Sequence, residues 1–364
     1  MNKLCYIFFD IFLFLVLYAC NEDKSSGYMA FDNVSYIEKF PKSYNLENGK
    51  LLDLNQTGVE SLLVKDSILI VSTSNKDGYW SFFRLSDYTF LGKYITGGKS
   101  DNELLSSPRV ANQYFVKRAG ELYAMIYDFN TGKVLLMDIE KTLNDNQMVI
   151  SKMDYKLPRG LYNFVCLDSS SFFCKKVNND FTEQLRFILK NGEKLIPKNM
   201  EILNKASIDV GFDFNILGTF CKYNSTTHRI VEAAMDLNHI NLYSIDSSFH
   251  LTICTGNQLD KIKEVQRVER RKKKVMYGHL ASYANYFAAL YQDDTNENIH
   301  FDRAKNQVIQ FFDWDGKPLV EVVLDRRINS FDIDFSNECL YTLNYEQDEI
   351  YVYDFKEALK CLKM

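Results

Sequence analysis

Residues able to do chemistry are few in this sequence and stand far apart. Its five histidines are too scattered for several of them to share one metal ion by a known ligand spacing: His228, His239, His250, His279 and His300. The sequence has no His-Glu-x-x-His, no Gly-x-Ser-x-Gly and no phosphate-binding glycine loop. We therefore predict no catalytic residue, no metal site and no cofactor, and we favour a non-catalytic role while leaving an enzyme open.

One loop offers polar groups to a ligand. It is the glycine-rich segment Gly97 to Leu104, which contains Lys99, Asp101 and Glu103. These side chains could hydrogen-bond a sugar or a peptide, and the alternative is a loop that merely links two structural units. Lys99, Asp101 and Glu103 are our candidate ligand-binding residues.

A second polar loop contains Asp293, Asp294 and Glu297. Carboxylate oxygens are the ligands that calcium prefers, but the spacing does not match an EF-hand loop. A solvated turn is the simpler interpretation.

The clearest charge feature is a basic run from Arg267 to Lys274, which contains six Arg and Lys residues. Apolar residues precede and enter it at three-residue spacing, and this predicts an amphipathic helix lying on the surface: Leu259, Ile262, Val265 and Val268. Its basic face could meet an anionic glycan, lipid phosphate or an acidic partner. A solvated surface segment is the alternative.

The first twenty residues read as an export signal and not as part of the fold. Lys3 gives a positive start, an apolar run follows, and a small residue, Ala19, precedes Cys20. This ending resembles a bacterial lipobox, in which the cysteine carries the lipid, and an ordinary cleaved signal is the alternative. We predict a signal peptide over residues 1–19 and a lipidated, flexible tether over residues 20–29, with Cys20 as the lipid attachment site.

Acidic residues stand just after Cys20, at Glu22 and Asp23. They resemble the surface-export signal of Bacteroidetes lipoproteins. The predicted location is the outer membrane, on its periplasmic or its cell-surface side, and the predicted first partner is the membrane, bound through the lipid.

Composition limits what the rest of the chain can be. The 364 residues include 46% apolar residues, enough for a sizeable core, and 43 Lys and Arg against 48 Asp and Glu give a net charge of −5. This mildly acidic balance argues against a nucleic-acid partner. The 27 Phe and 23 Tyr against only 5 Pro favour β-strands.

A short pattern recurs six times along the chain. It consists of a large apolar residue, any residue and a second large apolar residue, followed by a polar turn and a later Leu. Successive copies begin 54, 50, 56, 69 and 41 residues apart. The copies are Phe83-Arg84-Leu85, Met137-Asp138-Ile139, Phe187-Ile188-Leu189, Tyr243-Ser244-Ile245, Phe312-Asp313-Trp314 and Tyr353-Asp354-Phe355.

Six all-β units of about 50 residues predict a six-bladed β-propeller over residues 30–364, because four-stranded blades repeat at this period. Two stacked β-sandwiches are the alternative. The last unit has only three strands before the chain ends. We therefore expect an N-terminal strand, around Ser35–Phe40 or Leu51–Asn55, to complete it and close the ring.

Six cysteines lie beyond the export segment, and no two of them form a Cys-x-x-Cys pair. Cys166 and Cys174 flank a turn-like cluster and could face each other across a hairpin. Buried free thiols are the interpretation that we favour.

Two stretches carry a family resemblance. Gly97 to Leu104 resembles the Gly-x-Gly-Pro-x-Glu element of TolB-like six-bladed propeller lipoproteins of Bacteroidetes, here without its Pro. Phe311 to Asp334 resembles the passage from the penultimate to the last blade in that family. Together with the lipobox, the resemblance covers nearly the whole chain and implies the propeller and its envelope location.

These observations predict an envelope-anchored binding or scaffolding module with its site at one mouth of the central channel. A glycan or an envelope protein is the expected ligand. The alternative is a propeller hydrolase or polysaccharide lyase, which would need carboxylates or histidines converging at that mouth. A structural subunit of an envelope complex is a third possibility.

Overall fold

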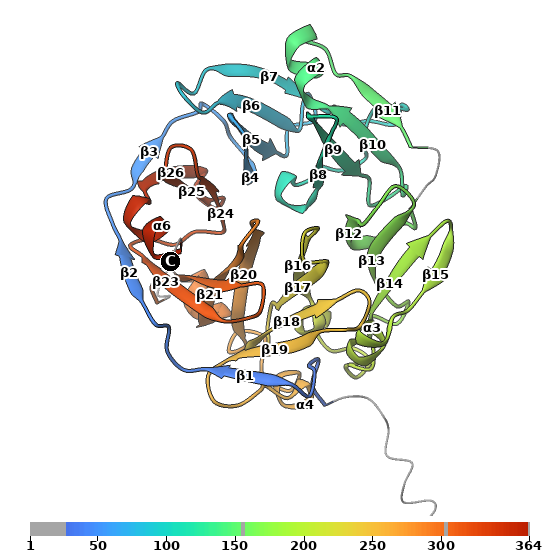
Figure 1. The fold of residues 1–364 in the computed structure, drawn as a ribbon, viewed down its shortest axis with the longest axis vertical. Coiled ribbons are helices and arrows are strands. Elements are labelled where there is room, and N and C mark those ends of the chain that lie inside the picture. The colour runs from blue at the N-terminus through green and yellow to red at the C-terminus, as the bar shows by residue number, and fades with distance from the viewer. Residues whose placement is uncertain (1–26, 154–156, 302–304, 363–364) are drawn as a thin grey trace, which may run out of the picture.

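The computed structural model describes residues 27–153, 157–301 and 305–362. The predicted signal peptide and Cys20 lie outside these residues. The predicted flexible tether over residues 20–29 is wrong at its end, because Met29 is fully buried in the propeller. Six sheets stand as blades around a central axis, and after its first three strands the chain visits them in order, so the all-β, six-bladed propeller is confirmed (Figure 1). No helix in the described part of the chain is long and apolar enough to cross a membrane.

Blades 1 to 3 each contain four antiparallel strands. Blade 1 consists of β4 (Val59–Lys65), β5 (Ile68–Thr73), β6 (Trp80–Arg84) and β7 (Phe90–Tyr94). Blade 2 consists of β8 (Tyr114–Arg118), β9 (Glu121–Tyr127), β10 (Val134–Asp138) and β11 (Ile150–Lys152). Blade 3 consists of β12 (Leu161–Cys166), β13 (Ser171–Val177), β14 (Gln184–Lys190) and β15 (Glu193–Leu195).

Blades 4 to 6 each take one strand from the N-terminal segment. Blade 4 consists of β16 (Thr219–Asn224), β17 (Arg229–Ala234), β18 (His239–Ser244), β19 (His250–Thr255) and β1 (Val34–Ile37). Blade 5 consists of β20 (Lys274–Ser282), β21 (Tyr286–Thr295), β22 (Val308–Asp313), β23 (Pro318–Leu324) and β2 (Ser43–Leu46). Blade 6 consists of β24 (Ser330–Asp334), β25 (Cys339–Asn344), β26 (Glu349–Asp354) and β3 (Lys50–Leu52).

Short helices lie in the connections between these strands. The α-helices are α2 (Ile139–Asp145), α3 (Lys198–Leu203), α4 (Ile262–Val265), α5 (Asn296–His300) and α6 (Lys356–Leu362). The 3-10 helices are η1 (Val110–Asn112) and η2 (Phe214–Leu217).

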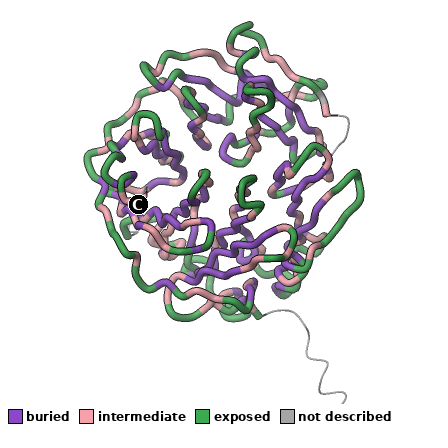
Figure 2. The backbone as a smooth tube through the Cα atoms, viewed as in Figure 1, coloured by how far each residue is buried: buried purple, intermediate pink, exposed green. Residues whose placement is uncertain are grey.

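The strands follow from the apolar runs of the sequence. The second strand of a blade is covered on both faces by neighbouring blades, so it reads as a continuous apolar run and not as an alternating one. In β5, for example, Leu69, Ile70 and Val71 are all fully buried. Each of the six predicted repeats begins in the third strand of its blade, and buried backbone is concentrated in the strands of the ring (Figure 2).

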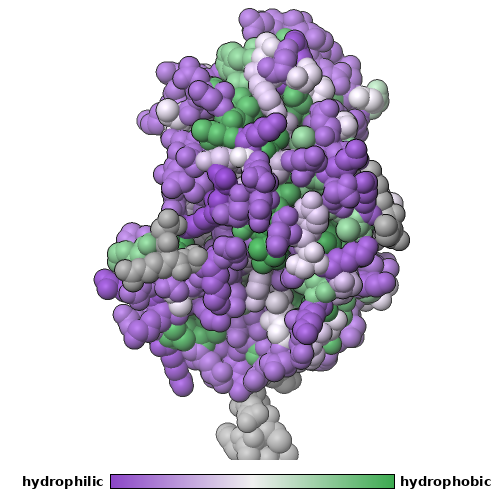
Figure 3. Space-filling model, turned by 90° about the vertical axis from the view of Figure 1, so that its left-hand side faces the viewer, coloured by the Kyte–Doolittle hydropathy of each residue, from purple (hydrophilic) through white to green (hydrophobic). Residues whose placement is uncertain are grey.

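One of the two predicted N-terminal strands closes the ring. β3 pairs antiparallel with β26, with Leu52 opposite Ile350, and supplies the missing strand of blade 6. The other predicted strand, Ser35–Phe40, is wrong for this role: β1 pairs in parallel with β19 and widens blade 4 instead. From blade 4 to blade 6 the N-terminal segment therefore follows the outer rim, where hydrophilic side chains alternate with smaller apolar patches (Figure 3).

The two ends of the ring differ in their connections. Because strands alternate in direction within a blade, the hairpins between first and second strands all lie on one end, which we call the hairpin face. The connections between blades and the turns between second and third strands lie on the other end, the linker face.

The helix predicted from Leu259 to Val268 is mostly wrong. α4 covers only four residues, and the chain then turns. Like charges three and four residues apart repel on a helix. The basic run instead unwinds so that Lys273 becomes buried and its Nζ lies 3.1 Å from Oδ2 of Asp213.

The cysteines of the described residues are free thiols. Cys166 and Cys174 do lie on the neighbouring strands β12 and β13, as the hairpin prediction required. They are not opposite each other, because Cys166 faces Phe172 and Cys174 faces Phe164. Burial raises the pKa of Cys174 to about 12, which makes it unreactive at neutral pH.

Candidate functional site

A cavity of about 650 Å³ occupies the central channel. The innermost strands of all six blades line it: β4, β8, β12, β16, β20 and β24. Its lining extends to the hairpins that follow four of these strands, through Asp66, Ser225, Ala284 and Ser336. The cavity therefore opens on the hairpin face.

Towards the linker face, the short helix η1 enters the channel. Its Val110 and Ala111 amides donate to Ser72 and Ser61 of blade 1, at 3.3 and 3.4 Å. From blade 4, on the other side of the ring, Lys222 Nζ donates to the Ala111 carbonyl oxygen at 2.6 Å. These hydrogen bonds link blade 1 to blade 4, on the opposite side of the ring, through η1 at the inner end of the cavity.

Asp332 connects three consecutive blades at the cavity wall. Its carboxylate accepts hydrogen bonds from the Val64 amide (2.8 Å), the Ile333 amide (2.9 Å) and the Tyr283 hydroxyl (3.1 Å). Burial raises the pKa of Asp332, while the charge of Lys65 and these donors act against that rise. Through these three hydrogen bonds the carboxylate links blades 5, 6 and 1.

The basic side chains of the cavity have fewer hydrogen-bond partners than Asp332 has. Burial lowers the pKa of Lys222 to about 8, with Asp332 opposing the shift and Lys65 adding to it. His279 lies edge-on to Phe331, with ring centroids 5.0 Å apart, and burial together with the charge of Lys222 lowers its pKa to about 3. The lining therefore carries two lysines, an imidazole that is neutral at neutral pH, and three Asp side chains. Besides Asp332 these are Asp66, which pairs with Lys117, and Asp334, which accepts from Ser336 and Asn337.

This arrangement favours a ligand that brings negative charge or hydroxyl groups. A lysine ammonium has three donors, and Lys222 makes a single hydrogen bond, to Ala111, within the described residues. Asn163 of blade 3 and Lys65 of blade 1 also line the cavity. No group of three or more His, Cys, Asp or Glu residues in the described ranges is arranged to hold a metal ion.

The three candidate ligand residues of the sequence lie elsewhere. Lys99, Asp101 and Glu103 belong to the connection between blades 1 and 2, on the linker face, and they do not line the channel cavity. The loop is held from within: the Glu103 carboxylate accepts the Ser100 amide at 2.8 Å, and this bond lowers the pKa of Glu103. Lys133 Nζ donates to the backbone oxygens of Ser100, Asp101 and Glu103.

The acidic loop near Asp294 is also occupied by its own chain. The Asp294 carboxylate accepts from the Thr295 and Lys305 amides and from the Asn298 side chain, at 2.8, 2.7 and 2.6 Å. Asp293 forms ion pairs with Lys274 and with Lys305. These contacts are those of a turn that caps α5.

The cavity residues carry no signal in the sequence repeat, because that repeat lies in the third strands of the blades. Lys65, Lys222, His279 and Asp332 each lie in the first strand of a blade, beside other polar residues of the same strand. A charge in the first strand of a propeller blade points at the axis or at a neighbouring blade, and that position was the available signal.

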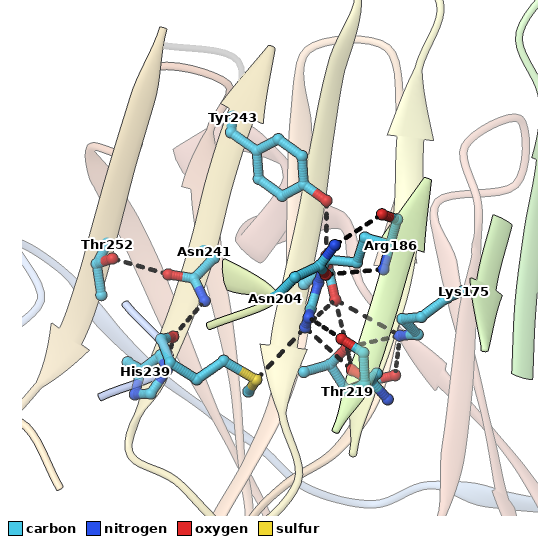
Figure 4. A network of polar contacts seen from close by, with 11 residues as sticks. Lys175, Arg186, Asn204, Thr219, His239, Asn241, Tyr243 and Thr252 are labelled. Atoms are coloured by element: carbon cyan, nitrogen blue, oxygen red, sulfur yellow. Dashed lines mark hydrogen bonds and ion pairs between the residues drawn. The ribbon is translucent and has the colours of Figure 1, made fainter. Parts of the chain in front are cut away.

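A second polar cluster lies between blades 3 and 4 and is fully enclosed (Figure 4). Glu232 accepts from Arg186 (Nε, 2.7 Å), Tyr243 (2.6 Å) and Thr219 (2.5 Å), and Lys175 Nζ lies 3.5 Å from it. The Lys175, Arg186 and Glu232 side chains are 0% exposed. Burial alone would raise the pKa of Glu232, but these two cations hold it at about 2.

The comparisons with known proteins place this fold in a family. Residues 60–336 match the family model described as TolB-like 6-blade propeller-like. The chain belongs to this family. No curated protein matches it.

Two solved structures from Bacteroides match this chain. A "Putative exported protein" from Bacteroides fragilis is 10% identical with a TM-score of 0.50, and the match covers 88% of this chain and 99% of that one. A member of the duf4221 family from Bacteroides vulgatus is also 10% identical, with a TM-score of 0.49, and the match covers 85% and 94% of the two chains. At this identity the similarity concerns the fold alone.

Proposed function

We propose that this TolB-like propeller is a lipid-anchored envelope protein that binds a ligand in its central channel. The observation that carries the proposal is the cavity of about 650 Å³ that opens on the hairpin face, with Lys222 and Lys65 in its wall. Ligand pockets of proteins have this size and combine apolar walls with a few convergent polar groups. The lipobox at Cys20 and the description of the Bacteroides fragilis structure as an exported protein support an envelope location.

A glycan with a carboxylate group is the ligand class that fits best. Its carboxylate would accept from Lys222, and its hydroxyl groups would pair with Asn163 and with the polar hairpin residues at the mouth. Lys99, Asp101 and Glu103 remain a proposed contact site that is separate from the channel, on the linker face.

The test is a glycan array probed with the full chain in detergent, with and without EDTA. The array carries neutral glycans and glycans that contain uronic acid. We expect the acidic glycans to bind, EDTA to have no effect, and Lys222→Met to weaken binding at least about tenfold, the loss typical of one charge-assisted hydrogen bond. Lys317→Met is the matched control, because Lys317 is an exposed lysine in the turn between the third and fourth strands of blade 5.

Two results would contradict this proposal. Unchanged affinity of the Lys222→Met protein would remove the channel from the function. EDTA-sensitive cleavage of a bound polysaccharide would instead establish the hydrolase or lyase alternative.

A further inference from the structure

Exposed apolar side chains gather on the linker face. Among the described residues, fifteen large apolar side chains are exposed, and nine of them lie in the segments of that face. The nine are Leu105, Phe129, Tyr162, Phe181, Val210, Phe212, Val268, Phe301 and Tyr345. The hairpin face has two, Phe90 and Phe335. Such one-sided clustering marks a surface that meets something other than water.

Four aromatic side chains form a continuous ridge on this face. Phe129 contacts Tyr162, Tyr162 contacts Phe214, and Phe214 contacts Phe181, with ring centroids 5.6, 6.2 and 6.4 Å apart. We call these four residues the aromatic ridge. They come from blade 2, blade 3 and the connection to blade 4, so only the assembled ring creates the ridge.

The basic run lies on the same face, joined to the ridge segment by the ion pair between Lys273 and Asp213. Residues 261–274 contain eight Lys and Arg and two Glu, a net charge of +6, in a chain whose net charge is −5. Lys273 and Lys274 are paired with Asp213 and Asp293. Exposed Arg267, Arg270 and Arg271 make no ion pair with any other described residue.

The described chain begins beside this basic run. The Gly27 carbonyl oxygen accepts a hydrogen bond from the amide of Ile262, the first residue of α4, at 3.0 Å. Two residues later, Met29 is fully buried, and its carbonyl oxygen accepts from His239 and Asn241 at 2.7 and 2.8 Å. The path of the chain out of the propeller is therefore fixed at the linker face.

The length of the preceding segment limits how far the ring can stand from its anchor. From Cys20 to Gly27 a fully extended chain spans at most about 25 Å. A membrane that holds Cys20 therefore lies within that distance of α4 and the basic run.

We propose that the linker face lies against the anionic membrane surface that holds the anchor. Arg267, Arg270 and Arg271 would meet lipid phosphates, and the aromatic ridge would enter the headgroup region, where aromatic side chains are favoured. This inference rests on the proposed lipid anchor at Cys20. It orients the channel mouth away from the membrane, because the cavity opens on the opposite face.

The experiment uses the full chain reconstituted on vesicles of phosphatidylcholine with or without phosphatidylglycerol. Exposed Arg and Lys residues in the turn at 267–272 are trypsin sites, so cleavage there reports whether the turn is covered. We expect the phosphatidylglycerol vesicles to slow this cleavage at least about fivefold relative to phosphatidylcholine alone, and high salt to abolish the protection because it screens the phosphates. Cleavage after Lys117 and Arg118, on the hairpin face, should not change.

Variants test the cause of the protection. In Arg267→Glu/Arg270→Glu/Arg271→Glu, cleavage after Lys272 should be equal on the two kinds of vesicle. The control Lys117→Glu/Arg118→Glu/Lys190→Glu changes the same number of charges at the hairpin-face ends of β8 and β14. It should leave the protection of the basic run intact.

The outcomes separate this inference from the proposed function. A chain that does not float with the vesicles and has an unlipidated N-terminus refutes the lipid anchor and this orientation with it. A chain that floats but is cleaved equally on both kinds of vesicle, or is protected equally in the triple variant, refutes the orientation alone. The linker face would then be assigned to a protein partner.

Discussion

The channel and the contact between blades 3 and 4 both bury charged side chains, but these side chains differ in how completely they are hydrogen-bonded. Between the blades, the Glu232 carboxylate is enclosed by Arg186, Lys175 and two hydroxyl groups, and no charge faces a cavity. In the channel, Lys222 makes one hydrogen bond and faces open volume. A saturated network fixes the relation between two blades, whereas an unsaturated one keeps donors for a ligand.

The substitution with the largest expected effect breaks the network around Glu232. Glu232→Gln leaves Arg186 and Lys175 buried without a carboxylate, and removing one partner of a buried ion pair costs about 3–5 kcal/mol. Urea unfolding of the variant measures this loss in the free energy of unfolding. Glu264→Gln, which removes an exposed partner of Lys261, is the control and should leave stability unchanged within error. A small loss in Glu232→Gln would mean that the network is dispensable.

The histidine beside that network predicts how stability depends on pH. Burial lowers the pKa of His239 to about 4, and its Nε2 bonds the Met29 carbonyl oxygen at 2.7 Å. Because the folded pKa lies below the ordinary value, neutral His239 contributes on the order of 3 kcal/mol to the free energy of unfolding above about pH 6.5. This contribution is lost as the pH falls from 6.5 towards 4.

Urea midpoints between pH 7 and pH 4 test this prediction. His239→Gln should flatten part of the pH dependence, and His279 should maintain the rest, because its pKa is lowered to about 3 in the same sense. An unchanged pH profile in His239→Gln would assign the acid sensitivity to other groups.

The channel lysine predicts a pH dependence of binding. With a pKa of about 8, Lys222 is mostly protonated at pH 7 and mostly neutral at pH 9. The affinity for an acidic glycan should therefore fall about tenfold over that interval. Isothermal titration at several pH values measures it, and Lys222→Arg should remove the dependence because arginine stays charged. A pH-independent affinity in the unmodified chain would speak against Lys222 as the ligand group.

The smallest expected effect concerns the glycine-rich loop. Lys99→Ala should change the affinity for the channel ligand less than about twofold, because Lys99 lies on the linker face and outside the cavity. Isothermal titration of the Lys99→Ala protein with the channel ligand measures this change in affinity. A clear loss of affinity would move the binding site to the loop that the sequence indicated.

The sequence was sufficient for the architecture because the repeat is local. Each copy, such as Phe83-Arg84-Leu85, lies in one blade and depends on neighbours within about 50 residues. The incomplete last unit also predicted that an N-terminal strand closes the ring, and β3 at Leu51 does so. The sequence could not assign Ser35–Phe40, since nothing in either short segment indicates which blade it pairs with.

The candidate site could not be predicted in the same way. Lys65, Lys222 and Asp332 belong to blades 1, 4 and 6, and nothing near them in the chain indicates that they share a cavity. The apolar stripe before the basic run predicted a helix, but the burial of Lys273 against Asp213 overrode it. These outcomes depend on contacts between segments far apart in sequence.

The sequence by itself therefore determined the number of blades, the closure of the ring by an N-terminal strand and an expected envelope location. Only the tertiary structure decided which polar residues meet, because a closed ring brings the first strand of every blade to one axis whatever the distance along the chain. The same closure gathers the aromatic ridge and the basic run on one face, and places the channel mouth on the other.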